Sequence, residues 1–169
     1  MSSYLMRFIL AWLVFSLLVL GCSQSPATAK VVQVIDGDTV VIEGGYWLRY
    51  IGIDTPEKGE PYYHEAWRAN RDLVGGQVVR LESDVTDKDK YGRLLRYIYV
   101  DGTFVNQELV RLGYARVYPK GTFPDNKYYE LLKEAEAEAE AEGRGIWQQE
   151  RPLTYDSFHL SCLTLCSIC

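Results

Sequence analysis

The fold is decided by residues 30–57, KVVQVIDGDTVVIEGGYWLRYIGIDTPE, in which three apolar segments rich in β-branched residues are separated by turn residues. The segments are Lys30–Ile35, Thr39–Glu43 and Tyr46–Ile53, with Asp-Gly-Asp and Gly-Gly between them. Such segments, bounded by Asp and Gly, are typical of consecutive strands joined by tight turns. The stretch therefore predicts a β-meander at the start of the folded domain.

The rest of the domain predicts two more strands and three helices. The strands are expected at Gln77–Glu82 and Arg93–Val100, and the helices at Pro61–Leu73, Val105–Leu112 and Tyr128–Glu142. Proline in the first turn and a Gly-Gly pair after the end delimit the first helix. Five strands with helices packed on one end of the sheet predict an α+β, mainly β fold, a five-stranded OB-type barrel with about three helices. The periodicity does not determine whether the barrel closes.

Length and composition limit the classes of protein. With 169 residues, 47% of them hydrophobic, the chain fits one domain with a real core, which excludes wholesale disorder and a short disulfide scaffold. The net charge of −5 argues against coating nucleic acid through bulk charge. Much of that negative charge lies in residues 130–144, which contain six Glu and only two basic residues, Lys133 and Arg144. Because Ala and Glu alternate there, Glu spreads around the helix, which predicts a solvated helix.

The N-terminal segment predicts export. Residues 9–20 form an uncharged apolar run of 12 residues, too short for a membrane span of about 20 residues but typical of a signal-peptide core. The following Val-Leu-Gly-Cys22 resembles a bacterial lipobox, in which the cysteine is lipidated. An ordinary secretory signal or an uncleaved anchor is the alternative. We expect a lipoprotein-type signal over 1–21, a tether over 22–29, a folded domain over 30–147, and attachment to the membrane of the cell envelope through Cys22.

The C-terminal residues 148–169 are expected to be a poorly ordered tail. Cys162, Cys166 and Cys169 have a spacing that could suggest an iron–sulfur motif, but they follow the apparent end of an exported domain. One disulfide with a spare thiol, or an apolar tail, are the alternatives. No pairing is assigned, and nothing in the sequence requires more than a monomer.

Three carboxylates are candidates for a metal site. Asp36 and Asp38 end one strand segment and Asp54 follows the third, so pairing of neighbouring strands can bring Asp38 and Asp54 to one rim. Carboxylates with a backbone carbonyl suit a hard cation such as Ca²⁺. Zinc is disfavoured, because the domain offers only His64 and no Cys. For each Asp alone, ordinary turn chemistry is the competing interpretation.

Two arginines and a glutamate could complete a site for phosphate chemistry. Arg49 interrupts an apolar strand, where a charge is costly unless it is paired or faces a site, so a structural ion pair is the alternative. Arg93 follows a polar loop and could grip phosphate oxygens, although such a residue is often only a surface residue. Glu57 follows Pro56 and could accept a proton from water, or be merely an exposed loop residue.

These segments together resemble the staphylococcal nuclease family. The motifs that carry the resemblance are VIDGDTV at 34–40, LR at 48–49 with IDTPE at 53–57, DKYGR at 89–93, VN at 105–106 with LVR at 109–111, and GIW at 145–147. They occur in the family's order from about residue 30 to 147. The resemblance implies an OB-fold barrel with three helices and a Ca²⁺-dependent phosphodiesterase site that cuts DNA and RNA with little sequence preference, leaving 3′-phosphate ends.

The resemblance also implies a metal-binding set. Asp38 and Asp54 would bind Ca²⁺, the backbone carbonyl of Thr55 would be a further ligand, and Asp36 would lie just outside the direct ligands. Glu57 would activate or orient the attacking water.

The remaining implied roles concern the substrate. Arg49 and Arg93 would hold the phosphate and stabilise its developing charge. Lys90 and Tyr91 match positions that contact the bound nucleotide. Family nucleases carry two nearby tyrosines on which a base can stack, but here only Tyr118 is present, with Phe123 as a candidate for the second ring. A catalytically inert member of the fold, binding single-stranded nucleic acid or a partner protein, is the alternative function; an exported scaffold that uses the C-terminal cysteines for metal is a third.

Overall fold

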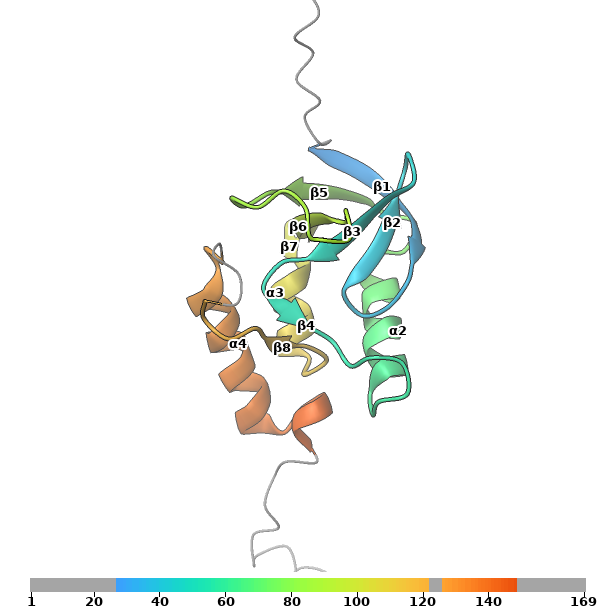
Figure 1. Cartoon of the computed structure of the whole chain (residues 1–169). Helices are drawn as coiled ribbons and strands as arrows, with labels where there is room; N and C mark the ends of the chain where they lie inside the picture. The colour runs from blue at the N-terminus through green and yellow to red at the C-terminus, as the bar shows by residue number, and fades with distance from the viewer. Residues whose placement is uncertain (1–26, 122–125, 149–169) are drawn as a thin grey trace, which may run out of the picture.

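Five strands form a closed barrel in the computed structural model, which describes residues 27–121 and 126–148 (Figure 1). Antiparallel pairing runs in the order β3-β2-β1-β5-β6, and a parallel pairing of β3 with β6 closes the ring. The strands are β1 (Thr28–Val34), β2 (Thr39–Ile42), β3 (Tyr46–Tyr50), β5 (Val78–Glu82) and β6 (Leu94–Val100). The predicted five-stranded barrel of OB type is confirmed, and its closure is now established.

The third predicted strand is split in two. It breaks after β3, where Gly52 adopts a left-handed φ of 79°, and continues as β4 (Ile53–Asp54). That short strand leaves the barrel and pairs antiparallel with β8 (Arg116–Val117), while β7 (Thr103–Phe104) extends the sheet beside β6. Asp54 therefore stands on a separate two-stranded ribbon next to the barrel.

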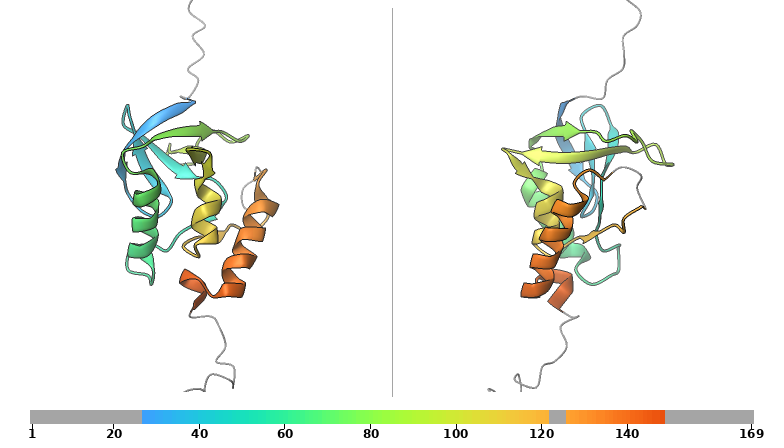
Figure 2. Two further views of the ribbon diagram at one scale, coloured as in Figure 1. Left: turned by 180° about the vertical axis from the view of Figure 1, so that it is seen from behind. Right: turned by 90° about the vertical axis from the view of Figure 1, so that its left-hand side faces the viewer.

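Three helices lie at one end of the barrel, as predicted. They are α2 (Tyr63–Val74), α3 (Val105–Arg111) and α4 (Tyr129–Glu142), with a 3-10 turn, η1 (Gly145–Gln148), after the last. Figure 2 shows α3 between α2 and α4, with all three on the same side of the strands. Apolar residues of the strands pack against α3 and α4 in one core that includes Val31, Ile42, Leu48, Leu109 and Leu132.

The first strand begins earlier than the sequence spacing indicates. Thr28 and Ala29 pair with Arg80 and Val79, so they belong to the barrel rather than to the tether expected over 22–29. The expected signal segment with Cys22, Phe123, and the C-terminal cysteines lie outside the described residues, and the expectations about them stay predictions. Within residues 27–121 and 126–148, no helix has the length and apolar character needed to cross a membrane.

The alternating Ala/Glu helix is only partly solvated. Glu134, Glu138 and Glu140 are exposed, as expected, but Glu136 is buried. Its Oε1 accepts the backbone N–H of Val117 at 2.7 Å, and its Oε2 pairs with Lys133. The prediction was wrong at this residue, because the buried face of α4 runs beside β8, whose peptide N–H needs an acceptor.

Candidate active site

The turn between β1 and β2 holds the first two carboxylates. The N–H of Asp38 donates to Oδ1 of Asp36 at 3.0 Å, a local bond typical of turns begun by Asp. The side-chain amide of Asn70, on α2, donates to the carbonyl of Asp36 at 2.9 Å and accepts the hydroxyl of Tyr50 at 2.8 Å. Burial raises the pKa of Asp36, although Thr39 and the charges of Arg49 and Arg93 oppose this. The turn is thus fixed both by its own Asp and by the helix beneath it.

Asp38 is the buried centre of the site. Its Oδ2 accepts both the backbone N–H and the hydroxyl of Thr55, each at 2.9 Å, and its Oδ1 accepts the hydroxyl of Thr39 at 3.1 Å. Gly37 allows this approach, since a Cβ there would lie 2.7 Å from Cβ and Oγ1 of Thr55. The bonds fix the Asp38 carboxylate against the segment that follows β4.

Arg49 joins the two candidate metal ligands. On β3 its guanidinium pairs through Nη1 with Oδ1 of Asp38 and through Nη2 with Oδ1 of Asp54, the latter at 2.7 Å. Only 10% of the Arg49 side chain is exposed, against 47% of that of Asp54. The ion pair that the sequence left as an alternative is present, and its partners are the same carboxylates that were predicted to bind metal. Asp38 and Asp54 therefore converge on one point, as predicted.

Tyr118 brings a phenol into the same network. Its hydroxyl donates to Oδ1 of Asp54 at 3.0 Å and accepts Nη2 of Arg49 at 3.3 Å. Burial and the neighbouring Asp54 raise its pKa, against the opposing effect of Arg49. The family resemblance predicts that Tyr118 serves as a stacking ring for a base. The structure adds that the half-buried side chain has its polar end fixed among the charged groups.

The loop before β6 positions Arg93. Nε of Arg93 donates to Oδ2 of Asp89 at 2.6 Å, while Oδ1 of Asp89 accepts the N–H groups of Tyr91 and Arg93. Burial raises the pKa of Asp89, but these bonds outweigh it and the net shift is downward. Lys90 and Tyr91 are exposed in the same loop. The charge of Arg93 acts to lower the pKa of Asp36 in the acidic turn.

Glu57 stands apart from this network. It is exposed, and its N–H donates to Oε2 of Glu60 at 2.8 Å while the N–H of Glu60 donates back to the Glu57 carbonyl at 2.9 Å. Within the described part of the chain, its carboxylate makes no hydrogen bond or ion pair. The structure thus brings together Asp38, Asp54 and Arg49, and leaves Glu57 directed to solvent from a braced loop.

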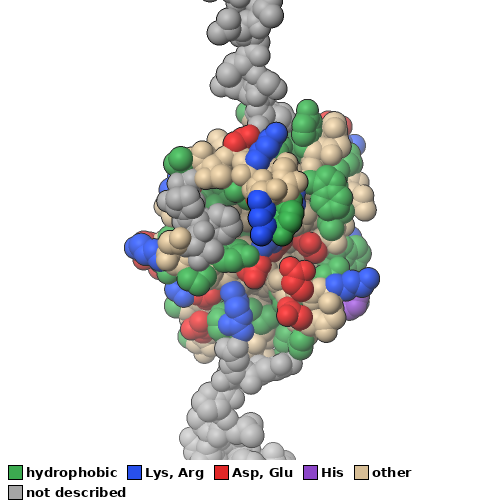
Figure 3. Space-filling view, viewed as in Figure 1, with side chains coloured by type: hydrophobic (Ala, Val, Ile, Leu, Met, Phe, Trp, Pro, Cys, Tyr) green, Lys and Arg blue, Asp and Glu red, His purple; other side chains and the backbone are tan. Residues whose placement is uncertain are grey.

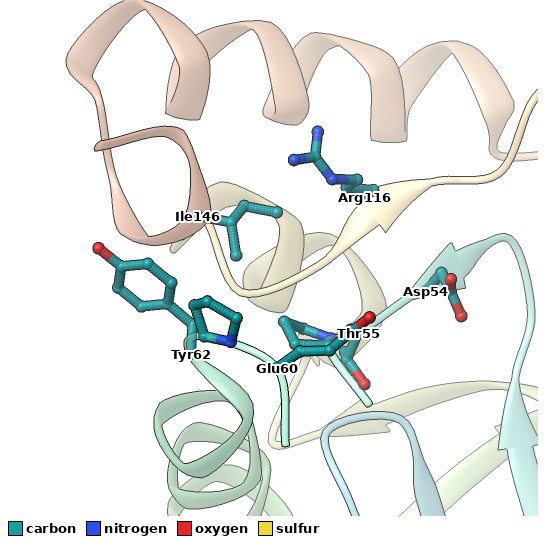
Figure 4. A pocket seen from close by; sticks show the side chains of 8 residues that line it. Asp54, Thr55, Glu60, Tyr62, Arg116 and Ile146 are labelled. Atoms are coloured by element: carbon teal, nitrogen blue, oxygen red, sulfur yellow. The ribbon is translucent and has the colours of Figure 1, made fainter. Parts of the chain in front are cut away.

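A hollow of about 360 Å³ opens beside the carboxylates (Figure 4). Thr55, Glu60 and Tyr62 line one side, and Arg116 and Ile146 line the other. Figure 3 shows Asp and Glu side chains gathered on this face near β4, with Lys, Arg and hydrophobic side chains above them. The arrangement places cations on both sides of an acidic centre, which suits a substrate that carries negative charge near a bound cation.

The donor set fits a hard divalent cation. No group of three or more His, Cys, Asp and Glu side chains is arranged for metal binding among residues 27–121 and 126–148. The donors at hand are the oxygens of two converging carboxylates, which match the preference of Ca²⁺ and not that of Zn²⁺. In this structure both carboxylates pair with Arg49.

Comparison with known proteins identifies the family of the chain. The profile of a family described as "Staphylococcal nuclease homologue" matches residues 47–149. The chain belongs to the staphylococcal nuclease family. It is 37% identical over 129 residues to a thermonuclease of Staphylococcus hyicus, covering 71% of this chain and 75% of that protein. It is also 37% identical over 154 residues to the endonuclease YncB of Bacillus subtilis (strain 168), covering 82% of this chain and 72% of the relative.

A third relative extends the comparison to a longer protein. The chain is 38% identical over 137 residues to the SPbeta prophage-derived endonuclease YokF of Bacillus subtilis (strain 168), covering 75% of this chain and 46% of that protein. The family and the enzyme class predicted from the motifs, a hydrolase of the nuclease type, are confirmed.

The motifs did not reveal the supporting residues. Asn70, Glu60 and Arg116 reach the site from α2, the loop after β4, and β8, and none belongs to a motif used above. Asn70 alone carried a signal: it lies on the buried face of α2 between Ala66 and Val74 at a spacing of four residues, where a polar side chain needs a partner. Glu60 and Arg116 are exposed, so nothing in their local sequence distinguishes them from surface charges.

Proposed function

We propose that the protein is a Ca²⁺-dependent nuclease that hydrolyses phosphodiester bonds of DNA and RNA with little sequence specificity. The products would carry 3′-phosphate ends, and the enzyme would act outside the cytoplasm, as the predicted signal segment implies. The observation that carries the proposal is the convergence of Asp38 and Asp54 on Arg49, with Arg93 nearby. This combination would supply a cation site together with two guanidiniums for the phosphate.

Asp38, Asp54 and the Thr55 carbonyl would hold the Ca²⁺. When bound, the ion would neutralise negative charge on the phosphate and polarise its oxygens. The hydrogen bonds from Thr55 and Thr39 keep the Asp38 carboxylate in place. Among the described residues, the more exposed Asp54 carboxylate is held by Arg49 and Tyr118 alone, so it has freedom to adjust to a ligand.

The arginines would bind the phosphodiester through charge-assisted hydrogen bonds. Arg49 is nearly buried, so its attraction to an anion is poorly screened and its geometry is fixed before substrate arrives. Arg93 is held by Asp89 and would approach the phosphate from the loop before β6. As charge develops on the phosphate oxygens, the two guanidiniums would stabilise it without moving.

Glu57 would accept the proton of the attacking water. Its carboxylate projects into solvent from a loop braced by Glu60, three residues from Asp54. The water oxygen would form a bond to phosphorus while the bond from phosphorus to the 5′-oxygen breaks, and the departing 5′-oxygen would gain a proton from solvent. The phosphate would then remain on the 3′-oxygen. A general base of this kind contributes on the order of 10²–10⁴-fold in rate.

A cleavage assay on the full chain tests the proposal. Single-stranded DNA and RNA oligonucleotides should be degraded with Ca²⁺, cleavage should stop on chelation, and the products should accept polymerase extension only after phosphatase treatment. Glu57→Gln should slow cleavage by roughly 10²-fold or more. Arg49→Ala should slow it by at least roughly 10²-fold, as expected for a donor that stabilises developing charge.

The matched control is Glu140→Gln, which changes an exposed carboxylate on α4 away from the site and should leave the rate unchanged. Full activity in the presence of chelator, or in the Arg49 and Glu57 variants, would refute the mechanism. Oligonucleotide binding without cleavage by the unaltered protein would instead favour the inert nucleic-acid-binding alternative.

A further inference from the structure

A second hollow, which we call the aromatic groove, lies beside Arg93. It has a volume of about 510 Å³ and is lined by Gly45, Tyr46, Trp47, Tyr91, Gly92 and Arg93. The turn before β3 and the loop before β6 meet here because those two strands are parallel neighbours, with Leu48 opposite Leu94. The groove is therefore a product of barrel closure and joins two segments more than 40 residues apart.

Three large aromatic rings in the groove are exposed to solvent. The exposed fractions are 52% for Tyr46, 49% for Trp47 and 72% for Tyr91. Gly45 and Gly92 add no side chains between them, and nothing lies within 4 Å of where their Cβ atoms would stand. Rings clustered in this way form an exposed apolar patch of the kind that marks a binding surface. Flat, solvent-exposed π-faces suit a planar ligand.

The loop that carries Tyr91 is held firmly in place. The buried Arg96 pairs with Asp87 at 2.6 Å, and the hydroxyl of Tyr97 donates to Asp84 at 2.8 Å. The bonds between Arg93 and Asp89 fix the end of the loop. Because the loop is ordered beforehand, a ligand would lose little free energy in ordering it.

Positive charge borders the rings. Nζ of Lys90 lies 5.0 Å from the centre of the Tyr91 ring, and Cζ of Arg93 lies 5.6 Å from the same centre. Arg93 is shared between the groove and the proposed phosphate site. A ligand that bridges the two must therefore carry an anionic group at Arg93 and a planar apolar group within reach of Tyr46 and Trp47.

A nucleic-acid strand has this combination at every residue. We propose that the aromatic groove is a base-binding subsite, in which Trp47 and Tyr46 stack on an unpaired base next to the phosphate held by Arg93. This inference rests on the proposed function. Stacking on aromatic side chains tolerates any base, so the subsite favours single-stranded over paired substrate without adding sequence specificity. In a duplex the base faces are already stacked and cannot enter the groove.

The test measures the Michaelis constant of the full chain on two single-stranded oligonucleotides of equal length. One oligonucleotide carries all its bases, and the other has abasic positions around the cleaved phosphate. Trp47→Ala should raise KM about tenfold on the complete strand, near the lower end of what base–aromatic stacking gives. Trp47→Phe keeps an aromatic face and should restore most of the binding. On the abasic strand, Trp47→Ala and the unaltered protein should have equal KM values.

The control is Val78→Ala, which trims a side chain that is 65% exposed on β5 and does not line the groove. An unchanged KM for Trp47→Ala on the complete strand would overturn the inference, and so would an equal rise in KM on both strands. If Trp47→Ala lost binding to anionic lipid vesicles but kept its oligonucleotide binding, the groove would be assigned to a membrane instead.

If the unaltered protein does not cleave, the proposed function fails on its own. Fluorescence anisotropy of the same oligonucleotides then tests the groove by binding alone. A Trp47-dependent preference for the complete strand would support the subsite, and no preference would overturn it.

Discussion

Removing the buried Glu136 carboxylate should destabilise the protein more than removing an exposed glutamate of the same helix. Oε1 of Glu136 is the acceptor for the N–H of Val117 at 2.7 Å, and Val117 itself is buried. Val117 stands between Arg116, which lines the hollow beside the acids, and Tyr118, which bonds to Asp54. The carboxylate thus ties α4 to the strand that supplies two side chains of the site.

The loss of stability in Glu136→Ala can be calculated from the backbone N–H that the substitution leaves without an acceptor. In Glu136→Ala the Val117 N–H stays buried without an acceptor, which costs about 1–3 kcal/mol. The bond is also charge-assisted and so stronger than a neutral one. The partner Lys133 is 44% exposed, so its ion pair adds little. We expect Glu136→Ala to lower the free energy of unfolding by about 2–3 kcal/mol. Glu136→Gln, which keeps an acceptor oxygen, should cost about 1 kcal/mol.

Urea unfolding of the full chain, followed by far-ultraviolet circular dichroism, measures this difference. Glu140→Ala is the matched control, because Glu140 is exposed on the same helix and the gain in helix propensity from Ala is the same. Nuclease activity, measured where both variants are folded, should fall in Glu136→Ala alone. Unfolding free energies of the two alanine variants within about 0.5 kcal/mol of each other would refute the reasoning.

Two further predictions concern pH and packing. Burial raises the pKa of Glu82, but the bonds from Lys127, Tyr128 and Arg80 outweigh burial and lower this pKa to about 2. The ionised Glu82 therefore stabilises the folded protein fully above pH 4.5, and this contribution is lost as the pH falls towards 2. Acid titration of stability should therefore show a smaller loss in Glu82→Gln than in the unaltered protein, by at most about 2 kcal/mol after solvent screening, and equal losses would contradict the assignment. Gly37→Ala should cost about 1–3 kcal/mol, because the new Cβ would meet Thr55, which cannot move without losing its bonds to Asp38. Thermal unfolding would check this, and an unchanged melting temperature would exclude the clash.

The strands and helices could be predicted because their signals are local. Alternating β-branched residues, Asp-Gly and Gly-Gly turns, and a proline at the start of a helix each act within a few residues of chain. The break after Tyr50 could not be predicted in this way. Ile53–Asp54 leaves the barrel because it finds its partner at Arg116–Val117, and that partner lies some 60 residues further along the chain.

Some of the site residues could likewise be predicted from local sequence, and others could not. Asp38 and Arg49 are brought together by the pairing of β2 with β3 in one meander, where Thr39 lies opposite Arg49, so their proximity follows from sequence spacing. Asp54 reaches Arg49 from β4, whose partner is the distant β8. The family resemblance predicts a substrate contact for Tyr118. Its bond to Asp54 required β8 to be placed beside β4.

The sequence by itself determined the family, the five strands of the barrel and the residues of the charged centre, because motif spacing and residue type set turns, strand polarity and local charge. Only the tertiary structure decided which glutamate of the Ala/Glu helix is buried, that Asn70 supports the acidic turn, and that Trp47 and Tyr91 share one groove. Each of these depends on where distant segments meet. Contacts between distant segments are set by the packing of the whole core, and a single local sequence pattern determines only a small part of that packing.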